Sequence, residues 1–302
     1  MQHRCLSVEN KKLLNIIPAP LSVATIQFFI GGLYISTLWL LRVRPTPKLT
    51  PQGVEVLSKV GFYHATGQLA SMISMGAGPI SFTHIVKALE PFFSAVVSAL
   101  VFGEWMKPEV YATLLPVVGG VGYACLQEPH FTWLSFLSAM ASNLAFALRA
   151  VVSKKAMSSY LGENLSPTNL FGVVTLFAAF ISVPIALLLE GTSFIPLWKS
   201  AVESSGKTVA ELVKAVLLSG MVHYLNNEVM YLALSNVHPV TLAVGNTMKR
   251  VFILVASVIA FRNPVSLQAA IGSAIGIGGV LLYSLAKEHY EKLERKSAGI
   301  AR

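Results

Sequence analysis

The sequence contains no aspartate, and all 14 of its acidic residues are glutamate. This excludes designs that depend on aspartate, such as aspartyl-phosphate pumps, aspartate-rich magnesium clamps and EF-hand calcium loops. Cysteine is also scarce: Cys5 and Cys125 lie far apart and match no CxxC or Cys/His ligand spacing. We therefore predict neither a disulfide framework nor a structural zinc site, and we expect no metal and no cofactor.

Charged residues are too few to cover a soluble globule of this size. They make up 12% of the 302 residues, whereas 54% are hydrophobic, and the mean hydropathy is +0.64. The composition therefore predicts a protein whose main solvent is the lipid bilayer. The net charge of +9 does not indicate nucleic-acid binding, because the basic residues form no stripe with aromatics between them.

Long apolar runs dominate the chain and predict an all-α membrane protein. Runs of about 20 apolar residues between charges or Pro/Gly breaks are typical of membrane helices. Nine such runs are present: Leu21–Leu41, Val60–Ala77, Ile80–Phe102, Tyr111–Leu126, Trp133–Val152, Leu170–Leu189, Ala215–Leu234, Val240–Phe261 and Leu267–Ala286. The longest linker, Glu190–Lys214, carries alternating charges, as expected of a solvated segment.

An internal repeat relates two parts of the chain at a shift of 159 residues. It aligns Phe93 with Phe252 and Phe102 with Phe261, and the VGGV run that starts at Val118 with an IGGV run. The second unit begins near Trp133, so the counterpart of its first helix would precede Met1. We therefore expect ten spans in two five-helix repeats, of which nine are visible and the first is missing.

These repeats define three predicted parts of the chain: residues 1–130, 131–290 and a charged C-terminal tail, 291–302. An odd number of helices per repeat inverts the halves in the membrane, as in alternating-access carriers. Twelve basic residues in the linkers on the C-terminal side, against seven on the other, favour a C-terminus on the inside. Met1–Lys12 contains no membrane span and no Ser/Arg-rich transit peptide.

Four basic residues lie within apolar spans, where each charge costs about 2.5 to 3.5 kcal/mol. They are Lys87, Arg149, Lys249 and Arg250. Structural pairing is one explanation, because Glu90 follows Lys87 by three residues and Glu228 could pair with the Lys249–Arg250 dipeptide. Two glutamates cannot neutralise four bases, however. The remaining charge of about +2 predicts an anion-binding site near the membrane midplane.

A phosphate dianion suits this group of cations, since guanidinium offers a planar fork of donors and ammonium a point charge. A carboxylate or the phosphates of a nucleotide would also fit. Gln68 and Ser71 share a face of their helix and are candidates to complete the site. His84 is interpreted as a packing or gate residue. Closing an empty site would seal the excess charge in low dielectric, so we expect only the loaded carrier to cross.

Four motifs resemble the plastid phosphate translocators of the drug/metabolite transporter superfamily. They are Ser81–Ser94 (SFTHIVKALEPFFS), Ser153–Met157 (SKKAM), Ala243–Phe252 (AVGNTMKRVF) and Leu282–Lys287 (LYSLAK). The resemblance covers about residues 13 to 290. It implies ten helices, the plastid inner envelope, and a strict antiporter, not an enzyme, that exchanges inorganic phosphate for a phosphorylated C3, C5 or C6 compound.

The resemblance also assigns roles to individual residues. It implies that Lys87, Lys249 and Arg250 hold the phosphate, and that Arg149 and Phe146 belong to the cavity or its gate. Glu90 and Glu228 are placed with this gate or cavity group.

Triose-phosphate members usually have His at the position of Gln68, Thr at Ser71 and Tyr at Asn226. Tyr224, half a turn away, is therefore the candidate to replace the lost aromatic hydroxyl beside Asn226. Triose phosphate with 3-phosphoglycerate is the first choice of organic substrate. A preference for hexose phosphate or phosphoenolpyruvate, or a nucleotide-sugar antiporter, stays open, and an oligomer is possible but not required.

Overall fold

The computed structural model describes residues 6–236, 249, 251–253, 255, 256, 259 and 267–297, and it is almost entirely helical. The elements are α1 (Leu6–Ile16), α2 (Pro20–Leu40), β1 (Lys48–Leu49), α3 (Pro51–Ala77), α4 (Ile80–Val86), the 3-10 turn η1 (Lys87–Leu89), α5 (Glu90–Phe102), α6 (Pro108–Ala112), α7 (Leu115–Leu126), α8 (Trp133–Met157), β2 (Gly162–Glu163), α9 (Pro167–Ser205), α10 (Val209–Asn236) and α12 (Leu267–Ser297). The two short strands pair antiparallel and join the α2–α3 connection to the α8–α9 connection.

The described part of the chain contains six helices that are long and apolar enough to cross a membrane. This confirms the predicted all-α membrane fold. Helices α3 and α10 are 27 and 28 residues long but are not among the six. The predicted span Val240–Phe261 lies largely outside the described residues, and the division into inverted repeats stays a prediction.

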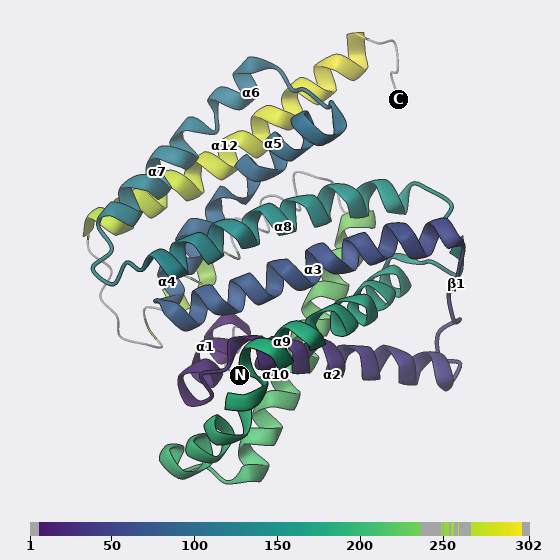
Figure 1. Cartoon of the computed structure of the whole chain (residues 1–302). Helices are drawn as coiled ribbons and strands as arrows, with labels where there is room; N and C mark the ends of the chain where they lie inside the picture. Colours follow the sequence, from purple (N-terminus) through teal and green to yellow (C-terminus); the bar gives the residue numbers. More distant parts are fainter. Residues whose placement is uncertain are drawn as a thin grey trace.

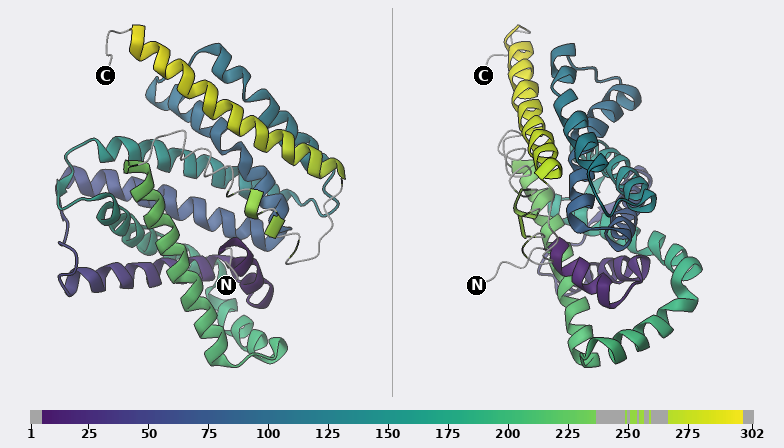
Figure 2. Two further views of the ribbon diagram at one scale, coloured as in Figure 1. Left: turned by 180° about the vertical axis from the view of Figure 1, so that it is seen from behind. Right: turned by 90° about the vertical axis from the view of Figure 1, so that its left-hand side faces the viewer.

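The helices form two groups that meet through α5 and α8. Helix α12 packs along α7, and both lie beside α5 and α6 in the upper part of Figure 1. In the other group α3 packs on α8 and α9, while α2 packs on α9 and α10 (Figures 1 and 2). The contact between α5 and α8 joins the two groups of helices.

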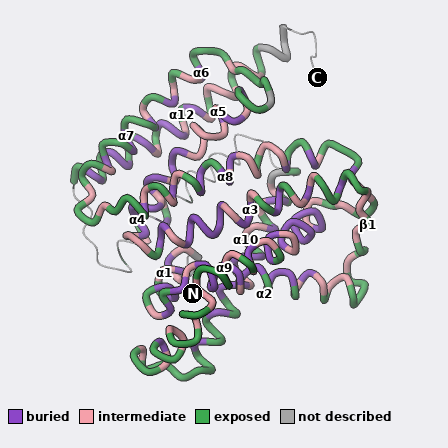
Figure 3. Tube along the Cα trace, in the orientation of Figure 1, coloured by how far each residue is buried: buried purple, intermediate pink, exposed green. Residues whose placement is uncertain are grey.

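The outer surfaces of both groups are rich in apolar side chains. Figure 3 shows buried residues along the facing sides of the helices and exposed ones along the outer sides. Large apolar residues are among the most exposed, including Leu33 at 71%, Phe180 at 72% and Leu188 at 85%. In a bilayer these surfaces face acyl chains, so their exposure is consistent with membrane-spanning helices.

Helices α7 and α12 approach each other closely through glycine. A Cβ atom added at Gly120 would collide with the backbone of Gly276 and would also meet that of Gly272. Small residues allow this backbone approach, which is a common way to pack helices in membranes. Gly272 and Gly276, which form a GxxxG motif in α12, therefore pack against α7 of the same chain.

The predicted span Ile80–Phe102 is confirmed as a candidate membrane span over Ile80–Val101, but it is not a single uninterrupted helix. It breaks into α4, η1 and α5 at Lys87. Pro91, in the first turn of α5, has no N–H to donate, and its ring clashes with the carbonyl of the residue four positions earlier, which is Lys87. Asn143 of α8 stabilises the break, because its Nδ2 donates to the Val86 carbonyl oxygen at 2.9 Å. Discontinuous helices of this kind are typical of transporter binding sites.

The segment Glu190–Lys214, predicted as a linker, is helical over much of its length, because α9 continues to Ser205 and curves beneath the bundle (Figure 2). Its extension packs on the core formed by α1 and α2 through Phe194, Leu197 and Trp198. The Glu190 carboxylate accepts hydrogen bonds from the backbone of Leu21 (3.0 Å) and Ser22 (2.7 Å). It therefore satisfies the unpaired N–H groups at the start of α2.

The two ends of the described chain are more helical than predicted. The short α1 packs against α3, α4 and α10, and its Lys11 Nζ donates to the carbonyls of Met75 (2.7 Å) and Gly78 (3.0 Å) at the end of α3. Helix α12 continues past Ala286 into the predicted charged tail. Pairs of Lys and Glu four residues apart support this extension.

Candidate anion-binding cavity

A cavity of about 200 Å³ lies at the break between α4 and α5. Nine of the predicted site residues line it: Gln68, Ser71, His84, Lys87, Glu90, Phe146, Arg149, Asn226 and Lys249. They come from α3, the α4–α5 segment, α8, α10 and the described residues after position 248. The polar residues that line the cavity lower the hydropathy of α3 and α10, which explains why these two long helices are not among the six apolar spans.

Lys87 is held by hydroxyl groups on two neighbouring helices. Its Nζ donates to the Oγ of Ser142 at 2.9 Å and to the Oγ of Ser71 at 3.4 Å. Ser142 in turn donates to the carbonyl of Gly67 at 2.8 Å, which fixes its own position. The ammonium also lies 4.4 Å from the ring centroid of Phe146. These neutral groups help to orient the Lys87 ammonium.

Arg149 also lies against the Phe146 ring, with its guanidinium carbon 4.8 Å from the ring centroid. Its Nη1 donates to His64 Nδ1 at 2.9 Å and to Asn227 Oδ1 at 3.3 Å. Because His64 is on α3 and Asn227 is on α10, Arg149 links both helices to α8. Phe146 therefore contacts two of the cations that line the cavity.

The cavity is positively charged in the part that the structure describes. Lys87, Arg149 and Lys249 line it together with a single carboxylate, that of Glu90. Glu90 can neutralise one of these three bases, which leaves an excess of about two positive charges. Arg250, the fourth predicted cation, lies outside the described residues.

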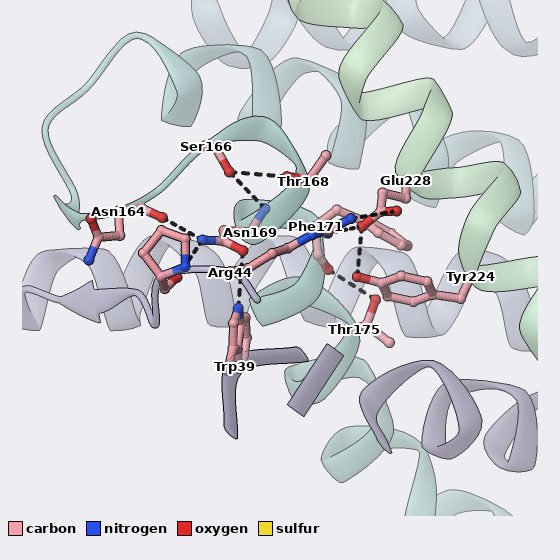
Figure 4. Close-up of polar contacts among 11 residues, drawn as sticks. Trp39, Arg44, Asn164, Ser166, Thr168, Asn169, Phe171, Thr175, Tyr224 and Glu228 are labelled. Atoms are coloured by element: carbon pink, nitrogen blue, oxygen red, sulfur yellow. Dashed lines mark hydrogen bonds and ion pairs between the residues drawn. The ribbon is translucent and has the colours of Figure 1, made fainter. Parts of the chain in front are cut away.

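Glu228 and Tyr224 do not line this cavity. The Glu228 carboxylate forms an ion pair with Arg44, and its second oxygen lies 3.4 Å from Arg44 Nη2 (Figure 4). Tyr224 donates to Glu228 at 3.2 Å and is fully buried against Tyr34 and Phe171. Pairing of Glu228 with the Lys249–Arg250 dipeptide was therefore the wrong partner assignment, and Tyr224 does not replace a hydroxyl at position 226.

The segment after α2 brings Arg44 to this pair. Asn169 of α9 accepts a hydrogen bond from Trp39 Nε1 at 3.0 Å and donates to the carbonyl of Pro45 at 2.8 Å (Figure 4). These contacts fix the chain on both sides of Arg44 against α9. Arg44, which follows α2, thereby reaches the Glu228 carboxylate of α10.

Comparison with known proteins agrees with this architecture. The model of the Triose-phosphate Transporter family matches residues 1–284. This chain belongs to that family. It is 38% identical to phosphoenolpyruvate/phosphate translocator 2, chloroplastic, of Arabidopsis thaliana, over 93% of this chain and 73% of that protein. It is 37% identical to the triose phosphate/phosphate translocator, chloroplastic, of Spinacia oleracea, over 96% and 70% of the two chains.

A third relative is the triose phosphate/phosphate translocator, non-green plastid, of Brassica oleracea var. botrytis, with 38% identity over 93% of this chain and 69% of that one. The resemblance to the plastid phosphate translocators is thus confirmed. The chain is a transporter rather than an enzyme, and it is a multi-pass plastid membrane protein.

This transporter also has a buried amide relay that sequence analysis missed. Asn10 Nδ2 donates to Met72 Sδ at 3.7 Å, and its Oδ1 accepts from Gln27 Nε2 at 2.9 Å and from Ser219 Oγ at 2.7 Å. Gln27 Oε1 accepts in turn from Gln68 Nε2 at 3.3 Å. The thioether sulfur of Met72 can only accept a hydrogen bond, so the NH2 group of Asn10 points to it and the Asn10 carbonyl oxygen points to Gln27. Gln27 therefore donates to Asn10 through its NH2 group and accepts from Gln68 through its carbonyl oxygen. The carbonyl oxygen of Gln68 is thereby left for the cavity.

Some of these residues carried a usable signal, and some did not. Ser142 directly precedes Asn143 within an apolar run, so a polar pair on α8 was visible in the sequence. Asn10 and Gln27 lie in different helices, and nothing in their spacing indicates a contact with Gln68 or with each other. Their grouping depends on how α1, α2 and α3 pack together.

Proposed function

We propose that this chain is a strict antiporter that exchanges inorganic phosphate for triose phosphate or 3-phosphoglycerate across the plastid inner envelope by alternating access. The observation that carries the proposal is the excess of bases in the cavity, where three cations accompany one carboxylate. A doubly charged phosphoryl group would balance that excess. The names of the relatives agree, since they describe phosphate translocators for phosphoenolpyruvate and triose phosphate.

Lys87, Arg149 and Lys249 would hold the phosphoryl group from different sides. Lys87 can keep its hydrogen bond to Ser142 while its remaining protons point to phosphate oxygens, because an ammonium has three donors. Arg149 has five N–H donors, of which its contacts with α3 and α10 use one nitrogen. Glu90 sets the net charge of the empty cavity.

The rule of exchange follows from the same charge balance. Closing the empty cavity would transfer about two excess positive charges into low dielectric, which costs several kcal/mol per ion. A bound dianion offsets these charges, so the loaded carrier closes and the empty one does not. Phosphate or a phosphate ester on either side then gives one-for-one exchange. This coupling requires no proton or sodium ion.

The orientation of Gln68 favours an organic substrate that carries a hydroxyl group. Its Nε2 already donates to Gln27, so its carbonyl oxygen is the group available as an acceptor. The hydroxyl groups of triose phosphate and 3-phosphoglycerate can donate to it, whereas the enol phosphate oxygen of phosphoenolpyruvate carries no hydrogen and cannot. Phosphoenolpyruvate stays the second candidate, because a phosphoenolpyruvate/phosphate translocator is 38% identical to this chain.

The test is counter-exchange in liposomes that contain the purified protein. Liposomes loaded with phosphate should take up labelled phosphate rapidly, and empty liposomes should take up almost none. Internal triose phosphate and 3-phosphoglycerate should support uptake better than phosphoenolpyruvate or glucose 6-phosphate. Net uptake into empty liposomes at the rate of exchange would contradict the charge argument. Support by nucleotide sugars but not by triose phosphate would contradict the substrate assignment.

A matched pair of variants connects this assay to the cavity. Lys249→Ala should lower exchange strongly, while Lys292→Ala, which removes an exposed lysine from the end of α12, should leave it unchanged. Normal exchange by Lys249→Ala would show that the phosphoryl group binds elsewhere.

A further inference from the structure

A second, larger cavity of about 610 Å³ opens between α5, α8 and α12. Its lining contains four lysines and two glutamates: Lys107, Lys154, Lys155, Lys287, Glu104 and Glu291. Hydroxyl groups of Ser94, Ser98 and Ser158 complete it. The excess is again about two positive charges, although this cavity shares no lining residue with the first.

Two helices lead from one cavity to the other. On α5, Ser94 follows Glu90 of the central cavity by four residues, or about one helical turn, and Ser98 follows after another turn. On α8, Lys154 lies five residues beyond Arg149. The walls of the second cavity are therefore direct continuations of the walls of the first.

The lysines of the second cavity come from three separate segments that converge there. Lys107 follows α5, and its ammonium lies 5.2 Å from the ring centroid of Tyr290 on α12. Lys287 is also on α12, where its Nζ lies 4.0 Å from the Glu291 carboxylate. Lys154 is on the opposite wall, in the last turn of α8. Such a concentration of one sign of charge in a concave region raises the local concentration of ions of the opposite sign.

We propose that this cavity is a second anion-binding site, which collects phosphate or a phosphate monoester from one side of the membrane and passes it to the central cavity. The inference rests on the proposed exchange of phosphate compounds, but it assigns separate residues. The site binds weakly, because its lysines are partly exposed to solvent and the anion must leave it again. Its effect is therefore on the capture of substrate, not on the turnover of a saturated carrier.

The test compares two variants with the same change in net charge. The first variant changes three lysines of the second cavity, which we call the vestibule, and is therefore named the vestibule variant: Lys107→Gln/Lys154→Gln/Lys287→Gln. The control variant is Lys199→Gln/Lys207→Gln/Lys214→Gln, which changes exposed lysines of α9, α10 and the segment between them. Both are reconstituted in phosphate-loaded liposomes of neutral lipid, and KM and Vmax for labelled phosphate are measured over a range of salt concentrations.

At low salt the vestibule variant should show a KM about three- to tenfold higher than the unmodified chain, with the same Vmax, and the difference should shrink at high salt. The control should stay within about twofold. Equal effects of the two variants, or an unchanged KM in the vestibule variant, would overturn the proposal. A KM of the unmodified chain that rises when anionic lipid is added, with no response in the vestibule variant, would assign the cavity to lipid phosphate instead of soluble substrate.

The outcome is separable from that of the proposed function. Loss of all exchange in the central-cavity variant Lys249→Ala, together with a normal KM in the vestibule variant, would overturn the second site alone. Normal exchange in Lys249→Ala, together with a salt-dependent KM in the vestibule variant, would overturn the central site alone.

Discussion

Two groups of charged residues among the helices of this protein differ in how their charges are balanced. At the Arg44 pair, one guanidinium meets one carboxylate and a tyrosine hydroxyl, so the charges balance within the protein. In the central cavity, three bases accompany Glu90, and neutral hydroxyl, amide and aromatic groups orient two of them. The first group is balanced without a guest, whereas under the proposed function the second binds a guest that carries negative charge.

The comparison shows that a base in an apolar span is not by itself a sign of a binding site. What distinguishes the two groups is the count of carboxylates within reach, and that count depends on the fold. Glu228 appeared able to neutralise a base of the cavity, but Arg44 already neutralises it. Because Glu228 lies outside the cavity, the three described bases there accompany one carboxylate, and the excess of about two positive charges predicted from the sequence is retained.

The largest expected effect is the loss of exchange in Lys87→Ala. Hydrogen bonds to charged groups contribute about 1.5 to 3 kcal/mol, so exchange in phosphate-loaded liposomes should fall by about 100-fold. Lys59→Ala is the matched control, because Lys59 is an exposed lysine of α3 that pairs with Glu55 at 2.6 Å. Its exchange should be normal. An active Lys87→Ala protein would remove the distinction between the two groups.

Glu228→Ala should affect stability more than transport. It leaves Arg44 without its carboxylate, and because 27% of the Arg44 side chain is exposed, the expected loss of about 2 kcal/mol is below that of a fully buried pair. A lower midpoint of thermal unfolding in detergent would be the measurement. The double variant Arg44→Ala/Glu228→Ala should recover most of the loss. If it recovered none, the two residues would not act as a pair.

Gln68→Leu should change the choice of substrate rather than phosphate binding. Loss of one neutral hydrogen bond, about 1 kcal/mol, should raise the KM for 3-phosphoglycerate about fivefold and leave that for phosphoenolpyruvate almost unchanged. Gln27→Leu should give the same pattern to a smaller extent, because it frees Gln68 to rotate. An equal rise in KM for both substrates would mean that the Gln68 carbonyl oxygen does not bind the hydroxyl group.

The smallest effect is expected at Phe146, whose ring contacts Lys87 and Arg149. Phe146→Leu keeps an apolar side chain but removes the aromatic face, and should raise the KM for phosphate about threefold at constant Vmax. Phe146→Tyr keeps the ring and should behave like the unmodified chain. A Phe146→Tyr protein as impaired as Phe146→Leu would indicate that volume, not the aromatic face, matters here.

The amino-acid sequence alone determined that the protein lies in a lipid bilayer, that its fold is all-α, and that its apolar spans contain more basic than acidic residues. Runs of apolar residues indicate membrane helices, because a helix of about 20 apolar residues is long enough to cross the hydrocarbon core of a bilayer. Such a run can be recognised from neighbouring residues alone. The same local reasoning located Lys87 and Arg149, since a charge within such a run is costly wherever its helix packs. The Ser81–Ser94 motif also contained the cause of the helix break, because in a continuous helix the Pro91 ring would clash with the Lys87 carbonyl only four residues away.

Tertiary structure decided which of these residues meet. Arg44 and Glu228 are 184 residues apart, and the relay from Asn10 to Gln68 crosses three helices. Such partners follow from the packing of the helices, and no local pattern encodes it. Hydrophobic burial specifies which residues leave water, whereas the pairing of buried charges and amides depends on distances of about 3 Å that only the assembled helices set.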